Sequence, residues 1–271
     1  MTDHQHLFWK GKKMEEQKMQ KNVPLIDAEK ALNFIQTLEY TDEEGILYLE
    51  QQLYNLLQKT PNDVNLLVLL LHEQIMHNRG RRARTIAYKI WENGGDLSVV
   101  SEQIYIDDLM NLGLSDMAGA ALAPYIADIN SSIKIHQNLL VKYAVYSGSM
   151  PLLSKLLDYL PDTREYNILR DWIVLNRDFG VSNHIPGIME RLIDKVQENM
   201  LGFSFNLYND REFPDVEFVF YVDDGITNYD ETKQLLNTQI ATYCASHKIE
   251  DLINLSVVLY PISRQKKLVI A

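Results

Sequence analysis

The chain has 271 residues, a formal net charge of −11 and one cysteine, Cys244. The surplus of carboxylates argues against general nucleic-acid binding, because affinity for phosphates depends on a surplus of Lys and Arg. One cysteine excludes an internal disulfide framework and a zinc site built from cysteines. The sequence has no apolar run of membrane-spanning length, and its N-terminus does not resemble a signal peptide. We therefore expect a cytoplasmic protein with a large buried core.

Residues 1–24 are polar, contain five lysines and show little periodicity before they end at Pro24. Such a segment cannot bury enough apolar surface to offset the entropy of ordering it. We expect a flexible N-terminal tail.

Residues 25–200 show the three-to-four-residue apolar spacing of amphipathic helices. Capping patterns at Thr41, Asn62 and Asp162 indicate where three of these helices start. We predict helices after Thr41 and after Gly80, and over residues 28–40, 66–78, 98–112, 116–127, 133–147, 151–160, 162–177 and 186–199.

Three glycines recur along this region: Gly80, Gly113 and Gly148, spaced 33 and 35 residues apart. Each follows one amphipathic stretch and precedes another, and a second series of Pro, Gly and Asn breaks lies between them. Two interleaved series of breaks at this period are typical of stacked helical hairpins, which form a solenoid. The alternative is an irregular helical bundle.

The period, the helix lengths and the glycine turn resemble the tetratricopeptide (TPR) family over residues 61–161, and in a longer interpretation over 28–161. Ala118 stands where that family prefers a small residue, whereas Thr85 and Leu153 at the equivalent places depart from it. The resemblance implies a degenerate TPR-like array. In that family the first helices of the hairpins line a concave surface that holds peptides.

From residue 201 the pattern changes to that of strands. Alternating residues predict a strand over 203–207, and apolar runs predict strands over 216–222 and 252–260, with a helix over 232–247 between them. The predicted fold class is mostly α, an α-α hairpin repeat (TPR-like) solenoid followed by a small ββαβ α+β domain. The middle or final strand should be central, because these two are the most hydrophobic. The helical-repeat domain would span 25–200 and the α+β domain 201–271.

Polar residues recur at a spacing of four on the first helix of each predicted hairpin. Side chains four apart share one helix face, and an amide can both donate to and accept from a peptide backbone. We expect these residues to bind a partner, although plain surface patterning is the alternative. They are Gln74, Asn78, Gln103, Asp107, Asn111, Asn138, Lys142 and Tyr146. Five of them, Gln103, Asp107, Asn111, Asn138 and Lys142, should lie exposed on one wall of a groove.

Two charged segments are candidate secondary surfaces. A basic turn contains Arg79, Arg81, Arg82 and Arg84. Guanidinium groups there could bind phosphate or a carboxylate-rich partner, but we favour a solvated turn or salt bridges to neighbouring acidic helices. If exposed, substituting Arg81 and Arg84 by Glu should hardly change stability.

The second charged segment is acidic, spans 208–231 and includes Asp223 and Asp224. It lacks the spacing of an EF-hand loop, so solvated turns are favoured over a metal site.

Catalytic and metal motifs are weak. Arg177 and His184 have a spacing that resembles the HEPN ribonuclease family, which implies a pair acting at a scissile phosphate. There is no nucleophile elbow, P-loop or dinucleotide fingerprint. His72 and His77 are five residues apart, and no carboxylate is placed to complete a metal site with them. We predict no catalytic residue, metal or cofactor.

The preferred function is non-enzymatic protein–protein binding, as an adaptor, scaffold or regulatory subunit that holds a peptide segment or helix in the solenoid groove. No membrane or general nucleic-acid partner is expected. One alternative is an acidic immunity- or antitoxin-type inhibitor of a basic protein, since complementary charge speeds association. Another is a HEPN-like RNA-directed enzyme that uses Arg177 and His184.

Overall fold

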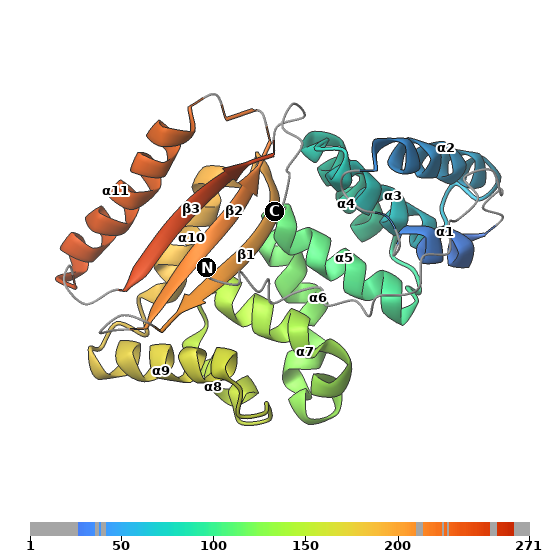
Figure 1. Cartoon of the computed structure of the whole chain (residues 1–271). Helices are drawn as coiled ribbons and strands as arrows, with labels where there is room; N and C mark the ends of the chain where they lie inside the picture. The colour runs from blue at the N-terminus through green and yellow to red at the C-terminus, as the bar shows by residue number, and fades with distance from the viewer. Residues whose placement is uncertain are drawn as a thin grey trace.

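The computed structural model describes residues 27–35, 38, 42–209, 214–223, 225–226, 228–249 and 254–262. Over these ranges the protein is mostly helical, and a three-stranded sheet lies toward the C-terminus (Figure 1). The helices that precede the sheet are α1 Ala28–Ile35, α2 Glu43–Lys59, α3 Val64–Met76, α4 Gly80–Asn93, α5 Val99–Asn111, α6 Ser115–Ala127, α7 Ile129–Tyr146, α8 Met150–Leu157, α9 Arg164–Asp178 and α10 Ile185–Val196.

Helices adjacent in sequence pack against each other, as in the pairs α3–α4, α5–α6 and α7–α8. Odd-numbered helices also contact the next odd-numbered helix, so that α1 touches α3, α3 touches α5 and α5 touches α7. This arrangement explains the composition of α3, in which Leu66 to Leu71 are all buried. A helix with neighbours on several sides needs apolar residues around most of its circumference.

One turn recurs between the helices of each pair. Asn78, Gly113 and Gly148 have left-handed backbones with φ of 57°, 74° and 67°. In each turn this residue's N–H bonds to the carbonyl three residues back, and the next N–H bonds to the carbonyl five residues before it, as in a Schellman motif. The three left-handed residues are 35 residues apart, so Asn78 is the counterpart of Gly113. The prediction that Gly80 plays this role is wrong, because Gly80 begins α4.

The N-caps predicted from sequence are close but displaced. A cap side chain must reach the second or third helical N–H, and in each described case the acceptor lies one residue after the predicted one. Thr41 itself lies outside the described residues. The residues that cap α2, α3 and α9 are Asp42, Asp63 and Thr163.

The sheet contains β1 (Met200–Tyr208), β2 (Asp215–Val222) and β3 (Leu255–Pro261) in the order β1-β2-β3. Strands β1 and β2 are antiparallel, whereas β2 and β3 are parallel. A parallel pair needs a crossover connection, which α11 (Tyr229–His247) supplies. The predicted ββαβ order is confirmed, and the strongly apolar β2 is central.

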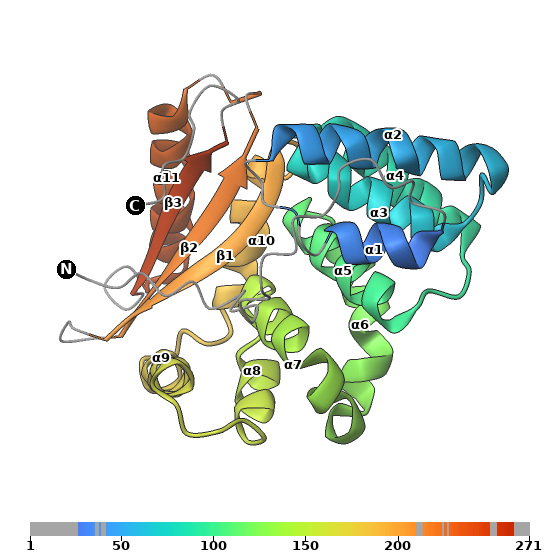
Figure 2. The ribbon, with the colours of Figure 1, turned by 45° about the vertical axis from the view of Figure 1, so that its right-hand side comes forward.

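The sheet and the helices share one core. Strand β1 lies nearest to the helical body and contacts α5 and α9, while α11 packs on β3 and α10 (Figure 2). Phe203 packs edge-on against Tyr146 of α7 at 5.1 Å, and Phe218 packs against Trp172 of α9 at 6.3 Å between ring centroids. No helix among the described residues has the length and apolar character needed to span a bilayer.

Candidate functional site

A polar network joins α5 and α7 to β1. It lies on the helix faces that carry Asp107, Asn111 and Lys142, which we call the inner face. The Lys142 ammonium donates to Asp107 Oδ1 at 2.6 Å and to Asn111 Oδ1 at 3.0 Å, and the Asn111 amide donates to Asp107 Oδ2 at 3.1 Å. Asn111 Oδ1 also accepts the backbone N–H of Phe203 at 3.2 Å. Asn111 therefore hydrogen-bonds an extended backbone, as the sequence suggested for these amides. That backbone is strand β1 of the same chain rather than a partner's peptide.

The adjacent helix α3 joins this inner face through a histidine. His72 Nδ1 lies 3.0 and 3.1 Å from the two carboxylate oxygens of Asp108, which is buried on α5. Burial of the ring lowers the pKa of His72, but the charge and hydrogen bond of Asp108 outweigh it and raise that pKa overall. Burial also raises the pKa of Asp108, which His72 opposes, and the hydrogen bond between the two side chains joins α3 to α5.

The 35-residue period shows which side chains are equivalent. His72, Asp107 and Lys142 each lie six residues before a left-handed turn residue, two residues away from the register that Gly80 suggested. Two residues rotate a helix by about 200°, to the opposite face. The first hairpin's predicted pair is therefore wrong in placement: Gln74 is buried on another face of α3, and Asn78 occupies the left-handed turn.

Exposure separates the remaining predicted binding residues. Gln103, Asp107 and Asn111 are partly exposed and Asn138 is exposed. The expected exposure is wrong for Lys142, which is 8% exposed. The proposed binding residue Tyr146 is fully buried against Phe203. The cause is β1, which covers this part of α5 and α7.

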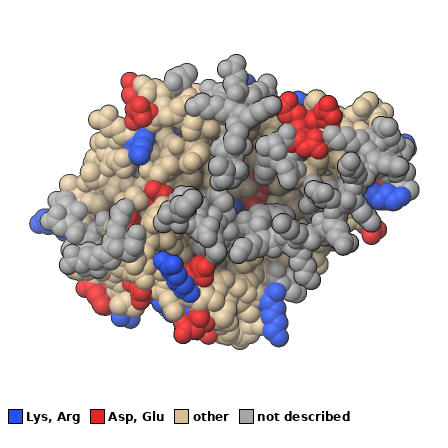
Figure 3. Space-filling view, viewed as in Figure 1, with Lys and Arg blue, Asp and Glu red and all other residues tan. Residues whose placement is uncertain are grey.

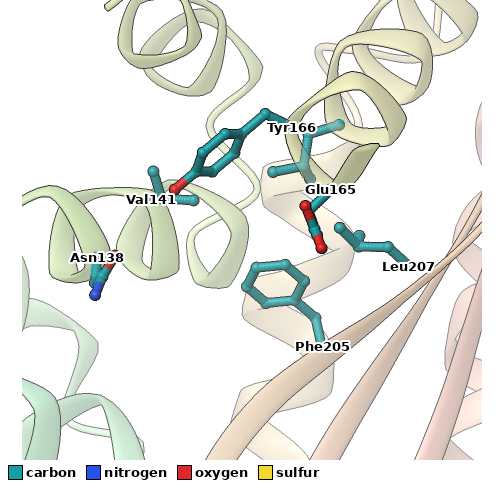
Figure 4. A pocket seen from close by; sticks show the side chains of 7 residues that line it. Asn138, Val141, Glu165, Tyr166, Phe205 and Leu207 are labelled. Carbon is teal, nitrogen blue, oxygen red and sulfur yellow. The ribbon is translucent and has the colours of Figure 1, made fainter. Parts of the chain in front are cut away.

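A small hollow, with about 30 Å³ of space open to the centres of water molecules, lies where α7, α9 and β1 meet (Figure 4). Its apolar walls come from all three elements. Asn138, Glu165 and Tyr166 add polar groups, and Gln137 Nε2 donates to the Tyr166 hydroxyl at 2.8 Å. Ligand pockets also combine apolar walls with a few fixed polar groups, but they typically measure roughly 300–1,000 Å³, so this hollow has room for no more than part of one side chain. The apolar lining residues are Val141, Leu169, Phe205 and Leu207.

The arginines of the basic turn are not one surface. Arg81 is exposed, but the Arg84 guanidinium donates to backbone carbonyls at Leu112 (3.2 Å), Met200 (2.9 Å) and Gln197. The prediction that Arg84 is a solvated surface charge is therefore wrong. It lies where α5, α10 and β1 begin or end.

The other two arginines of that turn contact α2. Arg79 donates to Glu50 Oε1 at 2.6 Å, and Arg82 lies 3.6 Å from the same oxygen and donates to the Tyr54 hydroxyl. Burial raises the pKa of Glu50, but the hydrogen bond and charge of Arg79 outweigh it and lower that pKa overall.

Glu50 is also part of a group that could hold a metal. One ligand atom each of Glu50, Glu73 and His77 lies within 4.8 Å of the others. Burial, and next the charge of Glu50, raise the pKa of Glu73 to about 7. The expectation that no carboxylate is placed near His77 is wrong, because Glu73 lies one helical turn before it and Glu50 comes from the neighbouring helix.

Two carboxylates of the acidic segment accept hydrogen bonds within the fold, whereas Asp230 and Glu231 are exposed. Asp223 Oδ1 accepts from the Asn199 amide at 2.8 Å and from the Gly225 N–H at 2.9 Å. Glu217 accepts from the Asn206 amide at 2.8 Å and from the Tyr208 hydroxyl at 3.0 Å. Asp224 lies outside the described residues. On the face in Figure 3, the acidic side chains of the described residues form separate small groups.

Arg177 and His184 have different surroundings. Arg177 is exposed at the end of α9 and pairs with Asp178 at 3.2 Å. His184 N-caps α10 and lies against Tyr243 and His247 of α11, with ring centroids 5.9 and 4.9 Å away. Among the described residues, no hydrogen bond or shared charged partner joins Arg177 to His184.

Comparisons of the chain with models of protein families, with curated proteins and with solved structures give no significant match.

Proposed function

We propose that the chain is a non-enzymatic, TPR-like solenoid that binds another protein as an adaptor, scaffold or regulatory subunit. The 35-residue recurrence of the left-handed turn, with contacts between successive odd-numbered helices, supports the solenoid. The single buried cysteine, Cys244, suits a cytoplasmic location.

The hydrogen bond from Phe203 N–H to Asn111 supports protein recognition on the inner face. It is an example, within the chain, of an amide on this face holding an extended backbone. Strand β1 already occupies the Asn111 side chain, so a partner must bind next to β1 rather than at Asn111.

The hollow between α7, α9 and β1 is the best-supported place. We place part of one apolar side chain of a partner segment against Phe205 and Leu207. The exposed Asn138 amide and the Glu165 carboxylate would then bind the partner's backbone N–H groups or a neighbouring basic side chain.

Site-specific photo-crosslinking tests this proposal in the protein's native cell. A photoreactive residue at position 138 should capture a defined partner, whereas one at exposed Asn130, in the segment of α7 before its kink at His136, should not. Binding of the captured partner should weaken by about 5- to 150-fold in Asn138→Ala, from the loss of about 1–3 kcal/mol, and remain unchanged in Asn130→Ala. Equal capture at both positions would refute the hollow as the site.

The properties of the captured partner, together with a ribonuclease assay, discriminate between the adaptor, inhibitor and enzyme functions. A basic partner whose affinity falls steeply with salt would favour the inhibitor function. Ribonuclease activity that Arg177→Ala abolishes would favour the enzyme. In either case the adaptor proposal would be replaced.

A further inference from the structure

We propose that Glu50, Glu73 and His77 form a binding site for a divalent transition-metal ion, for which Zn²⁺ is the best match. Two carboxylate oxygens and one imidazole nitrogen form the ligand set, which Zn²⁺ accepts. The site lies between α2 and α3, on residues that the proposed partner binding does not use.

The spacing of the ligand atoms fits a small ion. Ligands at tetrahedral Zn²⁺ lie roughly 3.3–3.4 Å from one another, from bond lengths of about 2.0–2.1 Å. His77 Nδ1 lies 3.5 Å from Glu73 Oε1 and 4.0 Å from Glu50 Oε2. Small rotations of these side chains would bring all three atoms to bonding distance of one point.

Glu73 gives an independent reason for a cation. Its side chain is fully buried, and Oε1 has no hydrogen-bond partner among the described residues. Buried carboxylate oxygens normally have a partner, because desolvation is costly without one. The oxygen faces His77 Nδ1 at 3.5 Å, and an ion between them would complete its interactions.

The second oxygen of the Glu50 and Glu73 carboxylates already accepts hydrogen bonds within the protein. Glu50 Oε1 accepts from Arg79 at 2.6 Å and from Gln74 Nε2 at 3.4 Å, and Gln74 Nε2 also donates to Glu73 Oε2. Outer contacts of this kind orient ligands and strengthen metal binding. Arg79 and Arg82, 2.6 and 3.6 Å from Glu50 Oε1, offset the Glu50 charge, so the Glu73 carboxylate supplies the negative charge that faces the ion.

Solvent can reach the site. The side chains of Glu50 and His77 are 14% and 13% exposed, so an ion has an entry path and a water can fill the fourth coordination position. A buried site of this type with three protein ligands keeps one position open.

Titration of chelator-treated, full-length protein with ZnCl₂ by calorimetry tests the site. We expect one Zn²⁺ per chain, and with CoCl₂ the visible absorption bands of four-coordinate Co²⁺. Glu73→Gln and His77→Gln should abolish both signals, while the exposed Glu43→Gln and His247→Gln controls keep them.

Circular dichroism confirms that each variant is folded. If Glu73→Gln does not fold, the His77→Gln variant, altered at a partly exposed side chain, decides the outcome. No saturable Zn²⁺ binding by the wild-type protein would overturn the proposal, and so would one Zn²⁺ per chain in folded His77→Gln.

Discussion

Arg84 lies at the point where three segments of backbone meet. Its guanidinium donates to the carbonyls of Leu112, Gln197 and Met200, which belong to the end of α5, the end of α10 and the start of β1. Helix ends leave carbonyls without an intrahelical partner, and a cationic donor there satisfies them and complements the helix dipole. Arg84 therefore links the helical region to the sheet.

Arg84→Ala should reduce the free energy of unfolding by about 2–3 kcal/mol, because hydrogen bonds to a charged group are lost and buried acceptors remain. Arg81→Ala, at an exposed position three residues earlier, should change it by less than about 0.5 kcal/mol. Urea unfolding measures both. Equal effects would mean that the Arg84 contacts contribute no more than a surface charge.

His136 predicts a pH dependence. Its ring is 4% exposed, and burial lowers its pKa, opposed by the charge of Glu102. Because the folded pKa is below the unfolded value of about 6.5, the unfolded state binds more protons below that pH. The part of the stability that depends on His136 should therefore be complete above about pH 6.5 and fall as the pH drops toward the folded pKa.

Unfolding of His136→Gln between pH 5 and 7.5 tests this sign. The variant should lose this part of the pH dependence, and the exposed His247→Gln should retain it. His72 and Glu73, whose pKa values are raised, titrate in this range with the opposite sign, so only the difference between variant and wild type reports on His136. An unchanged pH dependence in His136→Gln would contradict the prediction.

At the scale of elements, the left-handed turns can be tested by paired glycine substitutions. Gly113 and Gly180 share a φ of +74°. A Cβ at Gly113 would lie 2.8 Å from the Cβ of Gln197, whereas a Cβ at Gly180 would meet no atom within 4 Å. Gly180→Ala should cost about 1–2 kcal/mol for the backbone conformation alone.

Gly113→Ala should cost more than Gly180→Ala, and the difference reports the contact between this turn and the C-terminal end of α10. Thermal unfolding of the two variants under identical conditions gives that difference. Equal losses would show that α10 moves away without cost, and would remove the turn as an anchor for the C-terminal region.

Most elements could be predicted from sequence because their apolar periodicity is strong, including the ββαβ order. The position of the first left-handed turn could not be predicted, because glycine is the usual sequence sign of such a turn. Asn tolerates a left-handed backbone as well, and at Asn78 it does so two residues before Gly80. This displacement placed Gln74 on the wrong helix face.

The sites were harder to predict, because their residues come from different helices. Glu73 and His77 are one turn apart and could be paired from sequence, but Glu50 joins them only through the packing of α2 on α3. Likewise, nothing in the spacing of Asn111 and Lys142 indicates that Phe203 of β1 would occupy their face. Long-range packing decides both.

At the scale of the whole molecule, the helices and the sheet form one apolar core. Phe203 is 3% exposed and packs on Tyr146 of α7, and on Phe218 and Phe220 of β2. Contacts between α5 and β1 continue this core across the change from helices to strands. A core shared in this way should make unfolding of the two regions cooperative.

Phe203→Ala tests this cooperativity. It should cost about 3–5 kcal/mol, from lost burial and the cavity left behind. With Trp9 and Trp91 replaced by Phe, Trp172 fluorescence reports on the packing between α9 and the sheet, and far-ultraviolet circular dichroism reports on the helices. Both transitions should shift to lower urea by the same amount, while exposed Phe179→Ala leaves them in place.

If the fluorescence transition shifts and the helical transition keeps its midpoint, the sheet and the helices unfold independently. The inner face could then release β1 and offer Asn111 to a partner.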